Sequence, residues 1–317
     1  MQQPPPELWF TAFGLRIRSD FMLPGATAVP PPPGRDLVLR LVDREDLRPT
    51  DGDARHRGWN SFDGARYDWY EHGDGTLSFH YGERAWFELS AEGSELRCAA
   101  ADESEPTWQR VLLDTVLFSV SQLRGLELLH CSSVLLGGRL VSFVAHSGNG
   151  KSSLAGELVR RGATLFADDI LAFEQTGAGG VVAHPGPALM NVSTNPVGAS
   201  ADDLGTIIAT IGDEHWTLVQ RRGEVAPMAP SAIVLLERHA GATRCSCVPV
   251  PASSLALLPH SVVLPGLEHD HAPRFEAFAS LAETISLLRL EAPPSDSPAA
   301  LADATTAALA ADRGSGA

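Results

Sequence analysis

A glycine-rich stretch over residues 145–153 holds the side chains best suited to bind phosphate. It is A-H-S-G-N-G-K-S-S, and it follows a short apolar run over residues 140–145. Glycines 148 and 150 permit positive φ, and a helix predicted to begin near Lys151 directs its positive end at the same place. Lys151 would neutralise the β- and γ-phosphates, and the Ser152 hydroxyl would bind Mg²⁺, as in the pattern G-x-x-x-x-G-K-[ST]. The stretch therefore predicts a P-loop of the Walker A type for ATP and Mg²⁺, formed by Ser147, Gly148, Asn149, Gly150, Lys151, Ser152 and Ser153.

The alternative is a glycine-rich turn that only joins a strand to a helix. Lys151 is the single lysine of the chain, and the other basic residues among the 24 are all arginine, which replaces lysine poorly as a point charge. Downstream, an apolar stripe at helical spacing ends at Gly162, where a helix C-terminus favours glycine. Ala145 stands at the first glycine of the pattern, so the backbone must keep a negative φ there or be strained. The single lysine and the helical stripe favour the phosphate loop, and Ala145 is the one departure from its pattern.

Two adjacent acids follow the next predicted strand. Residues 163–167 are apolar, and Asp168 and Asp169 come directly after them. A parallel strand ending here would bring both carboxylates to the carboxyl edge of the sheet, where ligands of open α/β sheets bind. One acid could then hold Mg²⁺ while the other accepts a proton from an attacking hydroxyl. Solvated turn residues or helix caps are the alternative.

A histidine precedes the loop. His130 ends the strand-like start of LELLHCSSVLL, fifteen residues before Ala145. Spacing alone does not separate a catalytic histidine from one that is hydrogen-bonded in the core or at the surface.

Together these segments resemble a known family. His130, AHSGNGKS (145–152) and RGATLFADD (161–169) are similar to the C-terminal catalytic domain of HPr serine kinase/phosphorylase. They are more similar to the HPr-kinase-like proteins of peptide-tailoring pathways such as lasso-peptide biosynthesis. The resemblance covers residues 126–173 strongly and extends in pattern to about 293. It implies ATP as donor, a serine hydroxyl as acceptor, Asp168 as the base, and His130 and Asp169 in support. With Asp168 as the base, the loop pattern and the acid pair leave Ser152 and Asp169 as the expected ligands of Mg²⁺.

The chain departs from the bacterial enzymes at their second signature. Where those carry a glutamate and an IRGLG-like run, residues 185–198 are PGPALMNVSTNPVG. The resemblance therefore implies neither the reverse phosphorylase reaction nor HPr as the substrate.

The pattern along the chain predicts an α/β protein. Residues 59–99 alternate in short segments around a Gly73-Asp74-Gly75 turn, which indicates antiparallel hairpins. Residues 108–124 have the spacing of an amphipathic helix that links this region to the next. We expect a mainly β N-terminal region over 1–105, a P-loop, HPr-kinase-like catalytic domain with a mixed β-sheet over 106–293, and a flexible tail over 294–317 with one weak helix near 299–310.

Two further segments have open interpretations. The aromatic residues of the β region could present a peptide-binding surface or pack in the core; they are Trp69, Phe79, Tyr81, Trp86 and Phe87. Residues 191–229 are poorly patterned and suggest a flexible substrate loop. Arg221 or Arg222 there could stabilise charge on a transferring phosphate, or the two could be a solvated pair.

Composition limits the partners. With 317 residues and 44% hydrophobic content the chain can bury a large core, and its net charge of −15 argues against nucleic acid or an anionic membrane as a partner. The four cysteines lack the spacing of a zinc site, and we expect them to be buried reduced thiols. No signal peptide and no run of eighteen apolar residues is found, so we expect a cytoplasmic protein. A homo-oligomer is left open.

These patterns favour an ATP-dependent kinase that transfers the γ-phosphate to a serine-type hydroxyl of a peptide or protein. A kinase of a small hydroxylated metabolite is one alternative. A nucleotide-binding or ATPase regulatory module that transfers nothing to an acceptor is the other.

Overall fold

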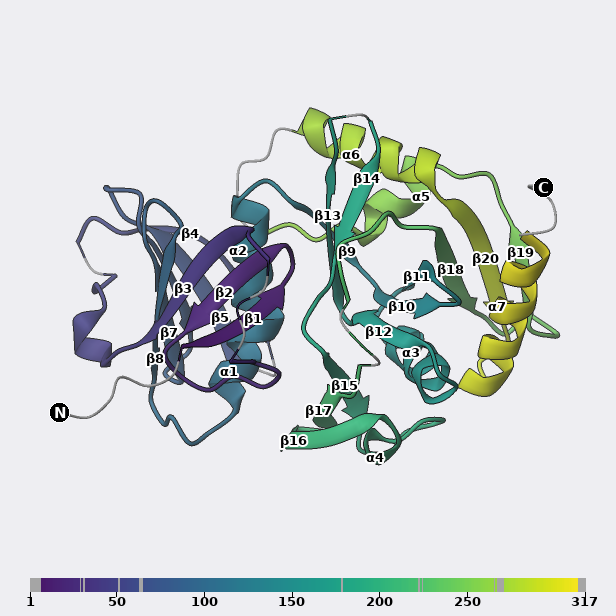
Figure 1. Cartoon of the computed structure of the whole chain (residues 1–317), viewed down its shortest axis with the longest axis horizontal. Coiled ribbons are helices and arrows are strands. Elements are labelled where there is room, and N and C mark those ends of the chain that lie inside the picture. Colours follow the sequence, from purple (N-terminus) through teal and green to yellow (C-terminus); the bar gives the residue numbers. More distant parts are fainter. Residues whose placement is uncertain are drawn as a thin grey trace. The chain divides into compact units, whose positions relative to one another are not determined.

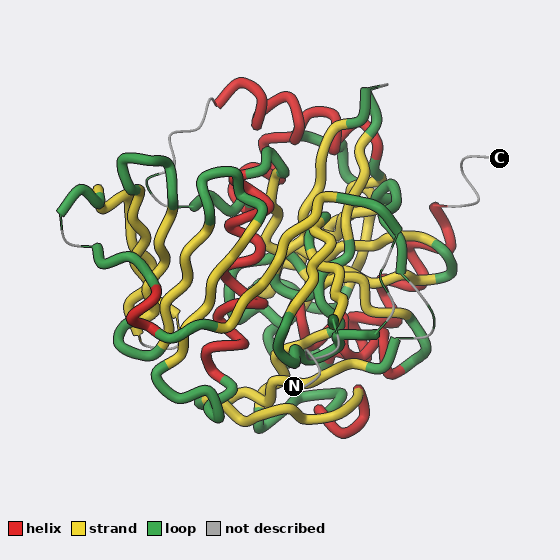
Figure 2. Tube along the Cα trace, turned by 60° about the vertical axis from the view of Figure 1, so that its left-hand side comes forward, coloured by secondary structure: helices red, strands yellow, loops and turns green. Residues whose placement is uncertain are grey.

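The structure, a computed structural model, describes residues 7–28, 30, 32–50, 52–62, 65–177, 179–221, 223, 225–264, 266 and 271–312. Contacts between residues divide the chain into two compact units, Met1–Leu126 with Val263–His269 and Glu127–Val262 with Asp270–Ala317. Strands dominate the trace (Figure 2), and the architecture is mixed α/β. Every helix in the described part of the chain falls short of the length and apolarity that a bilayer crossing requires.

The first unit is built on one sheet of eight strands, in the order β1-β2-β3-β8-β7-β6-β5-β4 (Figure 1). The predicted hairpin is confirmed, because the Gly73-Asp74-Gly75 turn joins β5 to β6 with Trp69 opposite Phe79. Only the pairs β2–β3 and β3–β8 are parallel. The strands are β1 (Leu8–Ala12), β2 (Leu15–Ser19), β3 (Arg35–Leu41), β4 (Arg55–Phe62), β5 (Ala65–Glu71), β6 (Leu77–Tyr81), β7 (Ala85–Leu89) and β8 (Glu95–Ala100).

A helical segment completes the first unit. It consists of α1 (Thr107–Val111), a π-helical turn (Leu112–Val116) and α2 (Leu117–Leu123). The Phe118 ring meets Phe13 edge-on at 6.4 Å, and the Ser121 hydroxyl donates to the Phe13 carbonyl at 2.8 Å. The segment therefore belongs with the first sheet, and the division falls after Leu126 rather than near residue 105.

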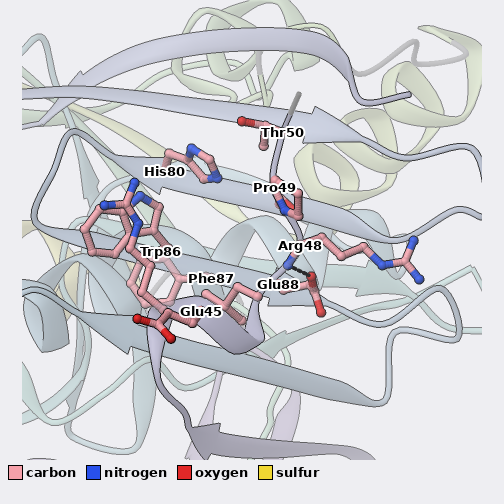
Figure 3. A pocket seen from close by; sticks show the side chains of 11 residues that line it. Glu45, Arg48, Pro49, Thr50, His80, Trp86, Phe87 and Glu88 are labelled. Atoms are coloured by element: carbon pink, nitrogen blue, oxygen red, sulfur yellow. Dashed lines mark hydrogen bonds between the residues drawn. The ribbon is translucent and has the colours of Figure 1, made fainter. Parts of the chain in front are cut away.

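The aromatic residues of the β region pack in the core. Trp69, Phe79, Tyr81, Trp86 and Phe87 are each at most 5% exposed, which supports core packing over a peptide-binding surface. A pocket of about 530 Å³ opens between residues 44–50 and strands β6 and β7 (Figure 3).

Three of the charged residues lining this pocket, Arg44, Arg48 and Glu88, already have partners within the first unit. The Arg44 guanidinium lies over the Trp86 ring at 3.9 Å, and Arg48 pairs with Asp74 at 2.7 Å. Glu88 pairs with Arg97 at 2.8 Å and accepts a hydrogen bond from the backbone N–H of Arg48. These three charges therefore do not single out a ligand.

The second unit is organised around a mixed six-stranded sheet in the order β12-β10-β11-β18-β20-β19. Strands β11, β18 and β20 are parallel neighbours, and β10 lies antiparallel between β11 and β12. Strands β11 and β12 therefore run in the same direction and end at the same edge. The strands are β10 (Ser132–Leu136), β11 (Arg139–Val144), β12 (Thr164–Ala167), β18 (Ala232–Arg238), β19 (Ser246–Pro249) and β20 (Ser286–Ala292).

Helices cover both faces of this sheet. On one face, α3 (Lys151–Arg160) and α7 (Pro298–Asp312) pack side by side (Figure 1), and Leu154, Leu158 and Leu301 meet the side chains of β11 and β18. On the other face, Phe278 and Leu281 of α6 (His271–Thr284) cover the alternate residues of the same strands. Two short helical segments, α5 (Ser254–Leu257) and the 3₁₀ turn Leu258–His260, precede α6. The alternation follows from the two-residue period of a strand.

Two smaller antiparallel sheets flank the main one. Strands β9 (Glu127–His130), β13 (Ile170–Gln175) and β14 (Val181–His184) form the first of them. Strands β15 (Leu189–Ser193), β16 (Gly205–Ile211) and β17 (Glu214–Val219) form the second, with a short helix α4 (Ala201–Leu204). The flexible loop expected over residues 191–229 is thus wrong for most of its length.

The C-terminal segment is a packed helix and not a flexible tail. Helix α7 buries Leu301, Ala302 and Leu309 in the core of the second unit. Its Asp303 forms an ion pair with Arg161, the residue that follows α3. Its alanines are strong helix formers and allow close approach to α3. Residues 313–317 of the expected tail lie outside the described residues.

The four cysteines carry free thiols. Cys98 and Cys131 are buried, and removal from water raises the pKa of the Cys131 thiol to about 12. Cys245 and Cys247 are half-buried, and reduced thiols remain the expectation for all four.

Candidate active site

The glycine loop, residues 145–153, follows β11 at the carboxyl edge of the main sheet and includes the first residues of α3. Gly148 and Gly150 have φ of 81° and 91°, values that favour glycine, and Gly150 is the N-cap of α3. Ala145 is not among the described residues with positive φ, so alanine at the first glycine position of the pattern causes no left-handed strain. The loop therefore presents backbone N–H groups and a helix N-terminus at one place, an arrangement that can bind an anion.

Lys151 is largely buried, with 7% of its surface exposed. Its Nζ donates to the Ala145 carbonyl at 3.2 Å, so the side chain folds back across the loop that precedes it. The sole ammonium group among the chain's side chains thus lies at the glycine loop.

Asp168 reaches the loop through a hydroxyl that the sequence did not single out. The Ser132 Oγ donates to Asp168 Oδ1 at 2.5 Å and lies 3.3 Å from the Ser152 Oγ. Ser132 begins β10, the antiparallel strand between β11 and β12, and therefore bridges the ends of both. Ser132 thus contacts both the carboxylate after β12 and the hydroxyl at the start of α3, which also hydrogen-bonds to Asp168 itself.

Asp168 has a strongly shifted proton affinity. Removal from water raises the pKa of its carboxyl to about 6, and the negative charge of Asp169 adds to the rise. Hydrogen bonds from Ser132, Ser152 and the Asn191 backbone oppose it. A carboxylate that titrates near neutral pH can take up and release protons under ordinary conditions.

Asp169 faces a different partner. It has φ 67°, which is rare for a residue with a side chain, and its carboxyl is half exposed. Strand β13 pairs with β9 so that Ile170 lies opposite His130, and this register brings His130 Nε2 within 3.3 Å of Asp169 Oδ1. The two adjacent acids therefore have separate neighbours, Ser132 for Asp168 and His130 for Asp169.

Two more histidines lie near the loop. The rings of His146, in the loop itself, and His260 are 5.9 Å apart. Ser261 bridges to Leu129 of β9, which places His260 close to His130. Removal from water lowers the pKa of both His130 and His260, and the charge of Lys151 lowers them further. Both effects favour the neutral imidazole at His130 and His260.

Sequence reasoning missed Ser132, His146 and His260. Ser132 stands two residues after His130, where its pattern is that of any polar residue at a strand start. His146 fills an unspecified position of the loop pattern. His260 is more than a hundred residues downstream, and backbone contacts of Ser261 and Val262 with β9 bring it back.

The donor atoms around Asp168 suit Mg²⁺. Ser152, Asp168 and Asp169 offer only oxygen ligands, which this cation prefers. Across the described ranges no group of three or more His, Cys, Asp or Glu residues is arranged to hold a metal. Mg²⁺ in phosphate sites often uses one or two side chains together with phosphate and water oxygens, so the residues fit that mode. Asp168 is the acid nearer Ser152, whereas Asp169 was the expected ligand.

Arg221 does not act as a free cation. Its guanidinium is buried and donates to the carbonyl oxygens of Leu165, Phe166, Gly186 and Pro187. Removal from water lowers its pKa to about 10. Arg221 thus ties β12 to the turn before β15, which argues against both a mobile arginine finger and a solvated pair. Arg222 lies outside the described residues.

Comparison with known proteins places the chain in no family. No protein-family model matches it, and no curated protein matches it. Among solved structures it is similar to the HPr(Ser) kinase/phosphatase from Coxiella burnetii, with 12% identity and a TM-score of 0.32. That match covers 59% of this chain and 98% of the other. A similarity this low carries no functional argument, so the proposals below rest on the residues of the site.

Proposed function

We propose that this chain is an ATP-dependent kinase that transfers the γ-phosphate to a serine-type hydroxyl. The observation that carries the proposal is the chain of contacts from Ser152 through Ser132 to Asp168, beside the only lysine. A hydroxyl of the kind that binds Mg²⁺ and a carboxyl with a pKa of about 6 thus meet at one glycine loop.

In the proposed reaction, the acceptor oxygen attacks the γ-phosphorus as the bond from that phosphorus to the β,γ-bridging oxygen breaks. ADP leaves, and the acceptor proton passes to the Asp168 carboxylate. The glycine loop N–H groups and the Lys151 ammonium hold the phosphates. Mg²⁺, bound by Ser152 and a carboxylate of the acid pair, would neutralise phosphate charge. Asp169 and His130 would support the site from the β9 side.

The acceptor class rests on the resemblance of residues 126–173 to HPr-kinase-like proteins, which implies a serine of a peptide or protein. A small hydroxylated molecule would fit the same chemistry. The free cysteines favour a reducing compartment, and we propose that the kinase acts in the cytoplasm.

Incubation with γ-labelled ATP tests the proposal, first without acceptor and then with serine-containing peptides or with small alcohols. Label should move to an acceptor in the wild type. Lys151→Ala should lose both ATP binding and transfer, whereas Asp168→Asn should keep most of the binding and lose transfer. Arg244→Ala, which changes an exposed arginine before β19, is the control and should behave as wild type.

Each distribution of the label has a distinct meaning. Label released to water alone would favour an ATPase module, and label retained on bound ATP would favour a nucleotide-binding module. Retained transfer in Asp168→Asn would refute the assignment of the base.

A further inference from the structure

An arginine at the end of β18 lies against the glycine loop. Gly150 has no side chain, and a Cβ placed there would be 3.7 Å from Nη2 and 3.9 Å from Nε of Arg238. Arg238 is the last residue of β18, the parallel neighbour of β11, so its strand ends at the same edge as the loop. Its guanidinium therefore touches the residue that immediately precedes Lys151.

One side of this guanidinium is anchored and the other is not. Nη1 donates to the carbonyl oxygens of Pro294 at 3.1 Å and Asp296 at 2.8 Å. Nε is buried and has no hydrogen-bond partner. The neighbouring acid Glu237 is directed to Arg289, at 3.5 Å. Within the described residues Arg238 has no carboxylate partner, so its charge is not neutralised by an ion pair.

The unanchored atoms form the part of arginine that binds phosphate best. Nε and Nη2 point their N–H groups in parallel, and this pair matches two oxygens of a phosphate or carboxylate. Both atoms are the ones nearest Gly150. A buried donor without a partner is unfavourable, so its persistence beside an anion-binding loop suggests that the ligand supplies the acceptor.

The order of strands in the sheet indicates which phosphate of the nucleotide lies nearest Arg238. In the sheet β12-β10-β11-β18, Asp168 follows β12 on one side of the loop and Arg238 ends β18 on the other. In the proposed kinase the γ-phosphate lies beside Asp168, where the acceptor attacks. The remainder of the nucleotide must then extend away from the acids, toward β18.

We propose that Arg238 binds the α-phosphate of the nucleotide through its Nε and Nη2 edge. This assignment rests on the proposed kinase function, and it adds a ligand on the nucleoside side of the loop. Gly150 is then required twice, for its positive φ and because a side chain would separate the guanidinium from the phosphate.

The test compares ADP and ATP binding by calorimetry in the full-length wild type, Arg238→Ala, Arg238→Lys and the control Arg244→Ala. Loss of a charged hydrogen-bonded pair should weaken ADP and ATP by the same factor, about tenfold to a hundredfold. The KM for ATP should rise while kcat changes little, because the α-phosphate is held equally in ground and transition states. Arg244→Ala should bind both nucleotides as wild type does.

Arg238→Lys separates ligand binding from anchoring. Lysine can still donate to the Pro294 and Asp296 carbonyls but lacks the paired N–H groups. We expect this variant to regain the wild-type melting temperature while it binds ADP as weakly as Arg238→Ala. Full recovery of ADP binding in Arg238→Lys would overturn the proposal, and so would a loss confined to ATP, which would put Arg238 at the γ-phosphate. Unchanged binding in Arg238→Ala would refute this inference alone, whereas a wild type that binds neither nucleotide would refute the kinase itself.

Discussion

Replacing Asp168 with asparagine should stabilise the folded protein while it abolishes the proposed reaction. The carboxyl is held where its charged form is poorly solvated, and this raises its pKa from 3.8 to about 6. Asparagine has nearly the same shape and no charge to desolvate. Its side-chain oxygen can still accept the hydrogen bond from Ser132.

The size and the pH dependence of the effect follow from the pKa shift. Because the folded-state pKa exceeds the unfolded value, the folded protein holds this proton more tightly, and that stabilisation is lost as pH rises through about 6. Above pH 6 the charged carboxylate lowers the free energy of unfolding by at most about 3 kcal/mol. Solvent screening of a half-buried group reduces this figure, so we expect Asp168→Asn to gain about 1–2 kcal/mol at pH 8 and about half of that at pH 5.

Urea unfolding at the two pH values measures the gain, and hydrogen exchange over β12 and β13 assigns it to the second unit. Asp213→Asn is the matched control, because it makes the same change in charge at an exposed turn between β16 and β17. The control should change stability by less than about 0.5 kcal/mol. An Asp168→Asn variant that is less stable than wild type at pH 8, or whose gain is larger at pH 5, would show that burial does not dominate this carboxyl.

Two further predictions concern the neighbours of Asp168. Ser132→Ala removes a hydrogen bond that lowers the pKa of Asp168, so the acid limb of the pH profile of kcat/KM should move upward from about pH 6 by up to about one unit. Ser133→Ala, whose hydroxyl lies 2.8 Å from Ser142, should leave the limb in place, and an unshifted limb in Ser132→Ala would argue against Asp168 as the base. Asp169→Ala should lower the free energy of unfolding by about 1 kcal/mol relative to Asp169→Gly, because alanine tolerates the φ of 67° poorly. Equal urea midpoints for these two variants would show that the backbone there is unstrained.

The strand, loop and helix around residues 140–160 could be predicted because their signals are local. The apolar run, the glycines and the helical stripe specify their own backbone, and the structure has β11 and α3 at nearly the expected residues. The placement of two acids after β12 was also predictable, since a buried strand ends where its apolar run ends.

The contacts of those acids could not be predicted. Strand β12 runs in the same direction as β11, as expected, but which acid meets Ser152 depends on β10, an antiparallel strand inserted between the two. The contact of Arg238 with the glycine loop could not be predicted either. It depends on the pairing of β18 with β11, and almost ninety residues separate these two strands in the chain. Contacts between segments far apart in the chain leave no local pattern.

Weak patterning explains why the sequence predicts flexible segments over residues 191–229 and 294–317, where the structure has strands and a helix. Strand β16 has mostly half-buried residues, so its sequence lacks the alternation that marks a one-sided strand. The alanine-rich segment of α7 has little amphipathic contrast, yet alanine's high helix propensity and small size let it pack tightly against α3. The low amphipathic contrast of α7 therefore reflects small buried side chains and not disorder.

The solitary lysine makes the proposed site chemically unique. Amine-selective acylating reagents spare guanidinium groups, so Lys151 carries the one side-chain amine that such a reagent can modify. Besides the amine at the N-terminus of the chain, each molecule would then take up one acyl group, on the lysine of its glycine loop. Intact-mass spectrometry would show this group as a fixed increase in mass. Occupancy of the loop by any ligand could be counted by its protection of that single amine, with no substrate and no turnover.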